Sequence, residues 1–154
     1  MQITVIAVGK LKEKYWKEAQ AEYLKRLLPY ASLSVLEVED EADEGDPARI
    51  KKQEGARITA KLKERDFVIA LEIQGVSCTS LQFAKKLQES FAQGFSRYVF
   101  VIGGSQGLDD AIVQRSHWRF SMSPLTFPHQ MARIILLEQL YRGFRIVTGA
   151  PYHK

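Results

Sequence analysis

The stretch Val99-Phe100-Val101-Ile102-Gly103-Gly104-Ser105-Gln106-Gly107 decides the fold. Its first four residues are β-branched or aromatic at both alternating positions, which is typical of a strand covered on both faces. The glycines that follow predict a tight turn at the carboxyl end of this strand, and a helix is expected to begin at Leu108 or Asp109. Strands that lead into helices in this way are the units of α/β folds.

Two further apolar runs, Ile3 to Val8 and Phe67 to Leu71, have the same character, and Ser32 to Val38 alternates like a strand nearer an edge. Helices are expected between the strands, with N-termini marked by Asp46-Pro47 and by the capping-box pair Thr79 and Gln82. The expected helices span about 15 to 28, 47 to 64, 80 to 92 and 128 to 142. This alternation predicts an α/β fold with a mainly parallel sheet and helices on both faces, formed by residues 1–154 as a single domain.

The composition is that of an ordinary globular domain, because 45% of the 154 residues are hydrophobic and 26% are charged. Cys78 is the single cysteine, and with only three histidines the chain offers no zinc-type ligand set, so we expect no metal. No apolar run reaches the roughly 20 residues of a membrane span, and Met1 leads directly into a predicted strand. We therefore expect a cytoplasmic protein without a targeting segment or a membrane partner.

The charge of the chain is unevenly distributed. Seven acidic residues fall between Glu37 and Asp46, and outside this block the chain carries a net charge of +11, against +4 for the whole. The block is predicted to form an exposed loop. The basic remainder suits a polyanionic partner such as RNA, although it also fits a role in solubility alone.

Three segments are candidates for ligand binding. The stretch from Val99 to Gly107 ends a strand where open α/β sheets bind ligands, but it lacks a phosphate-loop Lys-Ser/Thr, and Asp109-Asp110 would repel a phosphate. It fits a nucleoside-like ligand, or a simple tight turn. Phe67 to Gly75 is a second buried strand that ends in a polar residue and a glycine, and it also fits a plain strand and turn. Phe120 to His129 is stiffened by prolines and can offer backbone groups to an adenine edge, or serve as an ordinary connection.

The C-terminal region combines an apolar helix with a basic and aromatic tail. The helix from about Pro128 to Arg142 has little polar face, which predicts deep burial or a subunit interface and thus a homodimer. Glu138 and Arg142 are spaced as a stabilising helical pair, or as an arginine oriented toward RNA with Glu138 positioning it. The tail, Pro151 to Lys154, suits an RNA with unpaired bases.

Taken together, these segments resemble the motifs of a known protein family, although no single segment is specific enough to indicate that family. The quoted motifs are Ala7-Val8-Gly9-Lys10, Leu71-Glu72-Ile73-Gln74-Gly75, Phe100 to Gly107, Ser121 to His129, Glu138-Gln139-Leu140-Tyr141-Arg142 and Pro151-Tyr152-His153-Lys154. With them the chain resembles the SPOUT methyltransferases, and within these the ribosomal large-subunit pseudouridine methyltransferase H family. The resemblance extends over essentially the whole chain.

The resemblance implies a parallel α/β sheet with a C-terminal trefoil knot, a topology that general rules of chain connection would make the last guess. It implies transfer of a methyl group from S-adenosylmethionine to N3 of a pseudouridine in 23S rRNA, performed by homodimers on assembled ribosomes. The cofactor-binding residues that it implies are Leu71, Gly103, Met122, Ser123, Pro124, Leu125, Thr126 and Phe127.

The basic C-terminal segment supplies the candidates for the chemistry and for RNA binding. His153, Tyr152 and Arg142 are the candidates for orienting the base and easing its deprotonation, because a nearby cation favours a developing anion. Arg133, Arg142 and Lys154 are the candidate RNA-binding residues, and His129 is expected to shape the knot. Two other functions remain open: a SPOUT enzyme that acts on tRNA, and a non-catalytic ribosome-binding protein that has lost the cofactor.

Overall fold

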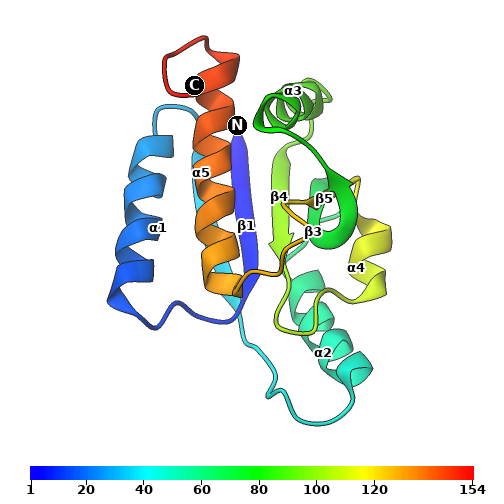
Figure 1. The fold of residues 1–154 in the computed structure, drawn as a ribbon. Coiled ribbons are helices and arrows are strands. Elements are labelled where there is room, and N and C mark those ends of the chain that lie inside the picture. The colour runs from blue at the N-terminus through cyan, green and yellow to red at the C-terminus, as the bar shows by residue number, and fades with distance from the viewer.

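The computed structural model describes residues 1–154 as strands and helices that alternate along the chain. In order, they are β1 (Gln2–Val8), α1 (Lys14–Leu27), β2 (Ser32–Val38), α2 (Pro47–Thr59), β3 (Asp66–Ser77), α3 (Ser80–Phe91), β4 (Arg97–Ile102), α4 (Asp110–Arg115), β5 (Trp118–Ser121) and α5 (His129–Val147). Helices α1, α3 and α5 lie over one face of the sheet, and α2 and α4 lie over the other (Figure 1).

The five strands are all parallel and lie in the order β2-β1-β4-β3-β5. The three apolar runs of the sequence occupy the centre, and the alternating run Ser32–Val38 is an edge strand as predicted. The expectation of a mainly parallel sheet with helices on both faces is confirmed. The implied knot stays a prediction.

Burial on both faces explains why the central strands are apolar at every position. In β1, Ile3 and Val5 pack into the core beneath α1, α3 and α5, whereas Ile6 and Val8 pack into the core beneath α2 and α4. Successive side chains of a strand point to opposite faces, so two covered faces require an unbroken apolar run.

The two predicted helix N-termini are confirmed in detail. The Asp46 carboxylate accepts a hydrogen bond from the Ala48 N–H at 3.1 Å, and Thr79 and Gln82 make both bonds of a capping box. The end of α2 differs from the prediction, because the helix stops at Thr59 rather than near residue 64. The chain turns there, and the Asp66 carboxylate accepts the Lys63 N–H at 2.6 Å.

The strands differ from the prediction in one region. β3 continues past Leu71 to Ser77, and it pairs with β5, a strand that the sequence did not reveal. Phe120 of β5 is the partner of both Leu71 and Val76, so residues 72–75 bulge out of the register. Four residues are too few to display a periodic pattern, which explains why β5 was missed.

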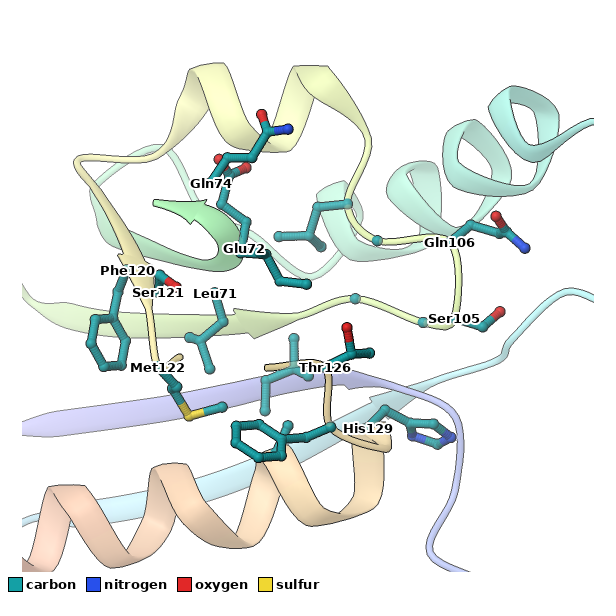
Figure 2. A pocket seen from close by; sticks show the side chains of 18 of the residues that line it. Leu71, Glu72, Gln74, Ser105, Gln106, Phe120, Ser121, Met122, Thr126 and His129 are labelled. Carbon is teal, nitrogen blue, oxygen red and sulfur yellow. The ribbon is translucent and has the colours of Figure 1, made fainter. Parts of the chain in front are cut away.

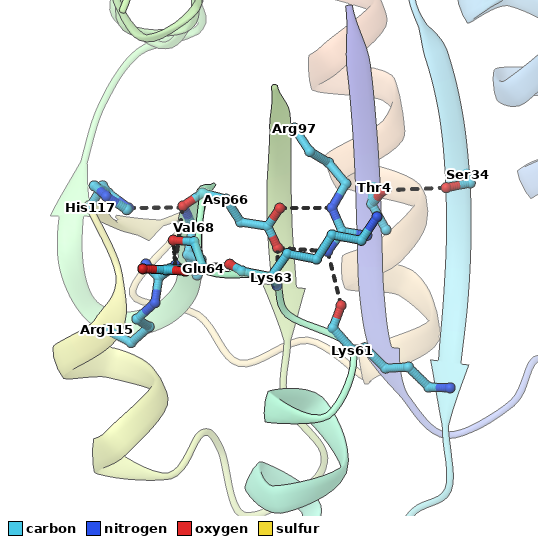
Figure 3. Close-up of polar contacts among 10 residues, drawn as sticks. All are labelled: Thr4, Ser34, Lys61, Lys63, Glu64, Asp66, Val68, Arg97, Arg115 and His117. Atoms are coloured by element: carbon cyan, nitrogen blue, oxygen red, sulfur yellow. Dashed lines mark hydrogen bonds and ion pairs between the residues drawn. The ribbon is translucent and has the colours of Figure 1, made fainter. Parts of the chain in front are cut away.

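At the amino end of the sheet, buried polar groups are paired with one another (Figure 3). The Arg97 guanidinium donates to both oxygens of Asp66, at 2.9 and 2.6 Å, and to the Lys61 carbonyl at 2.9 Å. Arg115 donates to backbone carbonyls of the turn before β3, and His117 Nδ1 accepts the Val68 N–H at 3.0 Å. This network closes the amino end of the sheet.

The C-terminal tail folds back on the end of α5. Gly149 takes a left-handed conformation with φ of +69°, which is the usual way for a glycine to end a helix. The Ala150 N–H then donates to the Arg145 carbonyl at 2.9 Å, and the Arg145 guanidinium donates to the Pro151 carbonyl at 3.1 Å. These bonds fix where the last residues of the chain lie.

Candidate functional site

A cavity of about 1130 Å³ lies at the carboxyl ends of β3, β4 and β5. Its walls come from the end of β3, from residues 103–107 after β4, and from residues 121–130 that lead into α5. Figure 2 shows Leu71, Met122 and Thr126 around this space, with Ser105 and Gln106 at its far side. All three candidate segments of the sequence meet here, at the sheet edge where α/β folds bind ligands.

The glycine loop, residues 103–107, forms the floor beside β4. A Cβ atom on Gly103 would lie 2.8 Å from the Gly107 carbonyl carbon, so no side chain fits there. The Gly107 N–H donates to the Gly104 carbonyl at 3.0 Å, and Gly107 has φ of +85°, which a glycine adopts without strain. The tight shape of this loop therefore depends on glycine at both positions.

The wall from β3 is held against β5. A Cβ atom on Gly75 would lie 2.8 Å from the backbone of Arg119, so strands β3 and β5 can approach this closely only because residue 75 is a glycine. The Arg119 guanidinium also bonds the Glu72 carboxylate, with 3.0 Å from Nε to Oε1. These contacts hold the segment that follows Leu71 at the rim of the cavity.

The third wall has a fixed shape from its own hydrogen bonds. The Leu125 N–H donates to Ser123 Oγ at 3.0 Å, and Ser121 Oγ donates to the Ser123 carbonyl at 3.3 Å. Thr126 makes no comparable hydrogen bond, so Ser123 is the residue whose hydroxyl caps a backbone amide of this loop. Leu125 keeps 69% of its surface exposed, which leaves an apolar side chain available at the cavity.

His129 begins α5 at the inner end of this loop. Its imidazole packs on Gly9, where an added Cβ would lie 2.9 Å from Cε1, and its Nδ1 has no hydrogen-bond partner. Burial, followed by the charge of Arg133, lowers the pKa of His129. The ring is therefore a neutral wall of the cavity.

The charges that line the cavity favour a cationic or neutral ligand over a phosphate. Three carboxylates, Asp43, Glu72 and Asp110, lie among the lining residues. Of the two cations there, Arg119 is already paired with Glu72, and Lys51 is the other. A ligand with an ammonium or sulfonium group suits such a lining, as a polyphosphate does not.

Arg133 is placed differently from its sequence assignment. Its side chain is 0% exposed and donates to Glu37 at 2.7 Å, to Gln20 at 3.3 Å and to the Gly9 carbonyl at 3.2 Å. It joins the start of α5 to β1 and β2. A buried guanidinium of this kind offers no surface to RNA, so we correct its assignment to a structural role.

The three candidate catalytic residues lie together at the other end of α5. Arg142 donates to Glu138 Oε1 from two nitrogens, at 2.9 and 2.6 Å, and its Nη1 lies 3.1 Å from His153 Nδ1. The Tyr152 hydroxyl donates to the same Glu138 oxygen at 3.2 Å, and the Arg142 guanidinium lies 4.8 Å from the centre of the Tyr152 ring. The pairing of Glu138 with Arg142 that their spacing predicts is confirmed, and the orientation of Arg142 toward RNA stays a prediction.

The electrostatics of this C-terminal cluster define what each group can do. The hydrogen bond to Glu138 raises the pKa of Arg142, which stays a cation. Burial and the Glu138 charge raise the pKa of Tyr152, so its hydroxyl keeps its proton. A guanidinium can only donate, which makes His153 Nδ1 an acceptor and leaves the imidazole proton on Nε2.

Within one chain the C-terminal cluster and the cavity are far apart. His129 lines the cavity, and Arg142 follows it by 13 residues of the same helix, or about 20 Å at the usual helical rise. Neither Arg142, Tyr152, His153 nor Lys154 lines the cavity. Lys154 is exposed at the end of the chain.

Most predicted cofactor residues do line the cavity, and the sequence missed several others. Those that line it are Leu71, Gly103, Met122, Ser123, Leu125, Thr126 and Phe127, whereas Pro124 does not. The missed lining residues include Asp43, Lys51, Ser105 and Gln106. Ser105 and Gln106 lie inside the quoted glycine stretch, so their place after a strand was an available signal. Asp43 had no such signal, because it reaches the cavity from a distant loop.

Comparison with known proteins identifies the family. A family model described as "Predicted SPOUT methyltransferase" matches residues 1–153. The chain belongs to the SPOUT methyltransferase family. Among solved structures, a probable methylase family protein from Haemophilus influenzae Rd KW20 is similar in fold to this SPOUT chain, with a TM-score of 0.54 and 13% sequence identity. The match covers 99% of this chain and 70% of that one.

Enzymes of the SPOUT class use S-adenosylmethionine, and the cavity fits this group. The glycine loop gives the close backbone approach that a nucleoside needs, the 121–130 wall adds apolar surface, and the carboxylates suit the cationic methionine end. No group of three or more His, Cys, Asp or Glu side chains could hold a metal ion. No helix combines the length and apolar character needed to cross a membrane.

Proposed function

We propose that this SPOUT methyltransferase transfers a methyl group from S-adenosylmethionine to N3 of a pseudouridine in 23S rRNA, and that it acts on assembled ribosomes as a homodimer. The observation that carries the methyl-transfer proposal is the cavity. It is formed by the glycine loop, residues 103–107, and by residues 121–130, which we call the prolyl loop, and the chain matches the family model over residues 1–153. The resemblance of the motifs to the pseudouridine methyltransferase H family supports the choice of substrate.

The cofactor would be held by seven lining residues and one that stiffens the loop. Leu71 and Met122 supply apolar contact, and Gly103 supplies backbone surface. Ser123, Leu125, Thr126 and Phe127 complete the wall, and Pro124 restricts the backbone between them. When bound, S-adenosylmethionine supplies a methyl group on a sulfonium, which is transferred by in-line displacement.

The residues of the C-terminal cluster would act on the base that receives the methyl group. Arg142 offers a permanent positive charge, which stabilises the anion formed when N3 of the base loses its proton. The Tyr152 hydroxyl and the His153 Nε2–H offer donors that can orient the carbonyl oxygens of the base. Glu138 is the positioning residue, because it fixes both Arg142 and Tyr152 through one oxygen. Methyl transfer then depends chiefly on orientation and on exclusion of water.

The separation of the two sites within a chain supports the homodimer. Arg142 lies about 20 Å from the cavity along α5, so one chain cannot bring Arg142 to its own cavity without unfolding. A second copy can bring its C-terminal cluster to the cavity of the first. Met131, Leu125 and Ile73 are large apolar side chains that stay exposed on or beside the cavity walls, where a second copy could cover them.

The test is transfer of labelled methyl groups to ribosomes that lack the modification, with free rRNA and bulk tRNA assayed in parallel and the labelled nucleoside mapped. We expect label only on a pseudouridine of 23S rRNA in whole ribosomes. Label on tRNA would show that the substrate is tRNA and not 23S rRNA. Cofactor binding without label anywhere would refute the rRNA substrate, and a folded chain with no cofactor affinity would favour the non-catalytic ribosome-binding protein.

The shared site has its own test, complementation between two inactive variants. Arg142→Gln removes the cation of the cluster, and Gly103→Ala forces the glycine loop of the cofactor cavity to shift. A mixed dimer contains one site with an intact cavity from one chain and an intact cluster from the other. We expect the mixture to regain activity that neither variant has. Light scattering at micromolar concentration should give the mass of a dimer, and a monomer mass would overturn the proposal.

A further inference from the structure

The acidic segment of residues 39–46 is exposed except at Glu41, as predicted, but one of its side chains, Asp43, contacts the glycine loop. Asp43 accepts hydrogen bonds from the Ser105 hydroxyl and from Gln106 Nε2, the latter at 3.4 Å. More than 60 residues separate these partners in sequence, yet Asp43 lies with Ser105 and Gln106 among the residues that line the cavity. Figure 1 shows this segment crossing from β2 to α2 on the side of the molecule where β4 ends.

The same segment is anchored to α2 by a buried carboxyl group. Glu54 is only 3% exposed, and its Oε2 accepts the Glu41 N–H at 3.0 Å. Its other oxygen, Oε1, has no partner and faces the glycine loop, since a Cβ atom on Gly104 would lie 2.9 Å from it. One turn later in α2, Arg57 donates to the Glu39 carbonyl at 2.8 Å and pairs with the Glu41 side chain.

These contacts form a path from α2 to the cavity. Glu54 and Arg57 hold the start of the segment, and Asp43 in turn holds the middle of the glycine loop. A loop with glycines at three of its five positions has a large conformational freedom to lose on binding a ligand. Contacts that restrict it beforehand reduce this cost at the moment of binding.

We propose that residues 39–46 form a strap that holds the glycine loop in its binding shape, with Asp43 and Glu54 as positioning residues for the cofactor. The identity of that cofactor rests on the proposed function. Neither residue needs to touch the reacting atoms. Asp43 acts on the loop through Ser105 and Gln106, and Glu54 acts through Gly104 and through the Glu41 backbone.

The first test compares Asp43→Ala with Glu44→Ala. The two variants remove the same charge from the same exposed segment, but the Glu44 side chain makes no hydrogen bond or ion pair, and only its backbone carbonyl is used, by Arg49. We expect Asp43→Ala to speed hydrogen exchange at amides 103–107 without any cofactor present. We also expect its Kd and KM for S-adenosylmethionine to rise about tenfold with kcat unchanged, as for the loss of one charge-assisted contact.

The second test compares two replacements of Glu54. Glu54→Gln keeps the volume and an oxygen that can accept the Glu41 N–H, so we expect cofactor affinity within about twofold of the wild type. Glu54→Ala loses both contacts, and we expect affinity to fall about tenfold. Equal losses in the two variants would contradict the positioning role that we assign to the hydrogen bond.

Failure of the strap and failure of the proposed function give different results. Exchange rates and cofactor affinity in Asp43→Ala that equal those in Glu44→Ala would overturn the strap, whatever the enzyme methylates. The wild type could fail to bind S-adenosylmethionine while Asp43→Ala still speeds exchange at the glycine-loop amides. That result would refute the identity of the cofactor and support the role of the strap.

Discussion

The two ends of the parallel sheet are built in opposite ways. At the amino end, Asp66 and Arg97 are buried and bonded to each other, and neither keeps a buried polar atom without a partner. Of the four buried side-chain polar atoms without a partner, three lie at the carboxyl end, Glu54 Oε1, His129 Nδ1 and Arg133 Nε, and the fourth is Arg145 Nε in the last turn of α5. Unpaired buried polar groups cost free energy, and natural proteins concentrate such costs at functional sites. The difference indicates that one end stabilises the fold while the other is shaped for a ligand.

The largest effect should come from breaking the amino end. Asp66→Ala leaves the Arg97 guanidinium buried without its counter-ion, and we expect a loss of about 3–5 kcal/mol in the free energy of unfolding. Urea denaturation measures this directly. The control is Glu22→Ala, which breaks an exposed pair with Arg26 and should leave the free energy of unfolding nearly unchanged. Equal losses in the two variants would mean that the buried network does not stabilise the fold.

The next effect concerns catalysis rather than stability. Arg142→Gln removes the cation that would stabilise the deprotonated base, and we expect turnover to fall about 100-fold while the Kd for S-adenosylmethionine stays unchanged. Label transfer to ribosomes and calorimetry give the two numbers. Lys85→Gln, at a 78% exposed lysine of α3, controls for loss of one positive charge. Full activity in Arg142→Gln would remove this residue from the proposed mechanism.

The carboxyl end can be tested at its closest backbone contact. In Gly103→Ala the new methyl group would lie 2.8 Å from the Gly107 carbonyl carbon, so the loop must shift. We expect affinity for S-adenosylhomocysteine to fall about tenfold or more, measured by calorimetry. Gly94→Ala is the control, because Gly94 has φ of +75° in the turn before β4 and does not line the cavity. If both variants bind alike, the loop does not form the binding surface.

The same contrast explains what could be predicted from the sequence. Local signals carried the central strands, the caps of α2 and α3, and the edge position of β2, because each depends on residues within a few positions of one another. The predicted end of α2 was too late because the hydrogen bonds that hold the turn after this helix come from more distant residues. Asp66 bonds Lys63 and Arg97 bonds Lys61.

For the candidate site, the walls were predictable and their supports were not. The glycine stretch and the prolyl loop can be recognised as loops from their amino-acid composition. In contrast, the burial of Arg133 depends on Glu37, about 100 residues away, and the contact of Asp43 with the glycine loop crosses more than 60 residues. No local pattern encodes such pairings. The separation of the C-terminal cluster from the cavity also follows only once α5 is placed along the sheet.

The smallest expected effect is the pH dependence that His117 gives to the amino end. Burial, followed by the charge of Arg115, lowers the pKa of His117 from its ordinary 6.5, and its Nδ1 must stay unprotonated to accept the Val68 N–H. The unfolded chain therefore binds this proton more readily than the folded one. The stabilisation is fully present above pH 6.5 and is lost as the pH falls below it.

We therefore expect the urea midpoint of the wild type to decline between pH 7 and about pH 5.5, and to decline less in His117→Asn, which cannot titrate. His129 also has a lowered pKa and contributes in the same direction, so His129→Asn should remove a separate part of the slope. The double variant should remove both parts, since the two rings lie at opposite ends of the sheet. An unchanged slope in His117→Asn would mean that its hydrogen bond to Val68 does not hold the ring neutral.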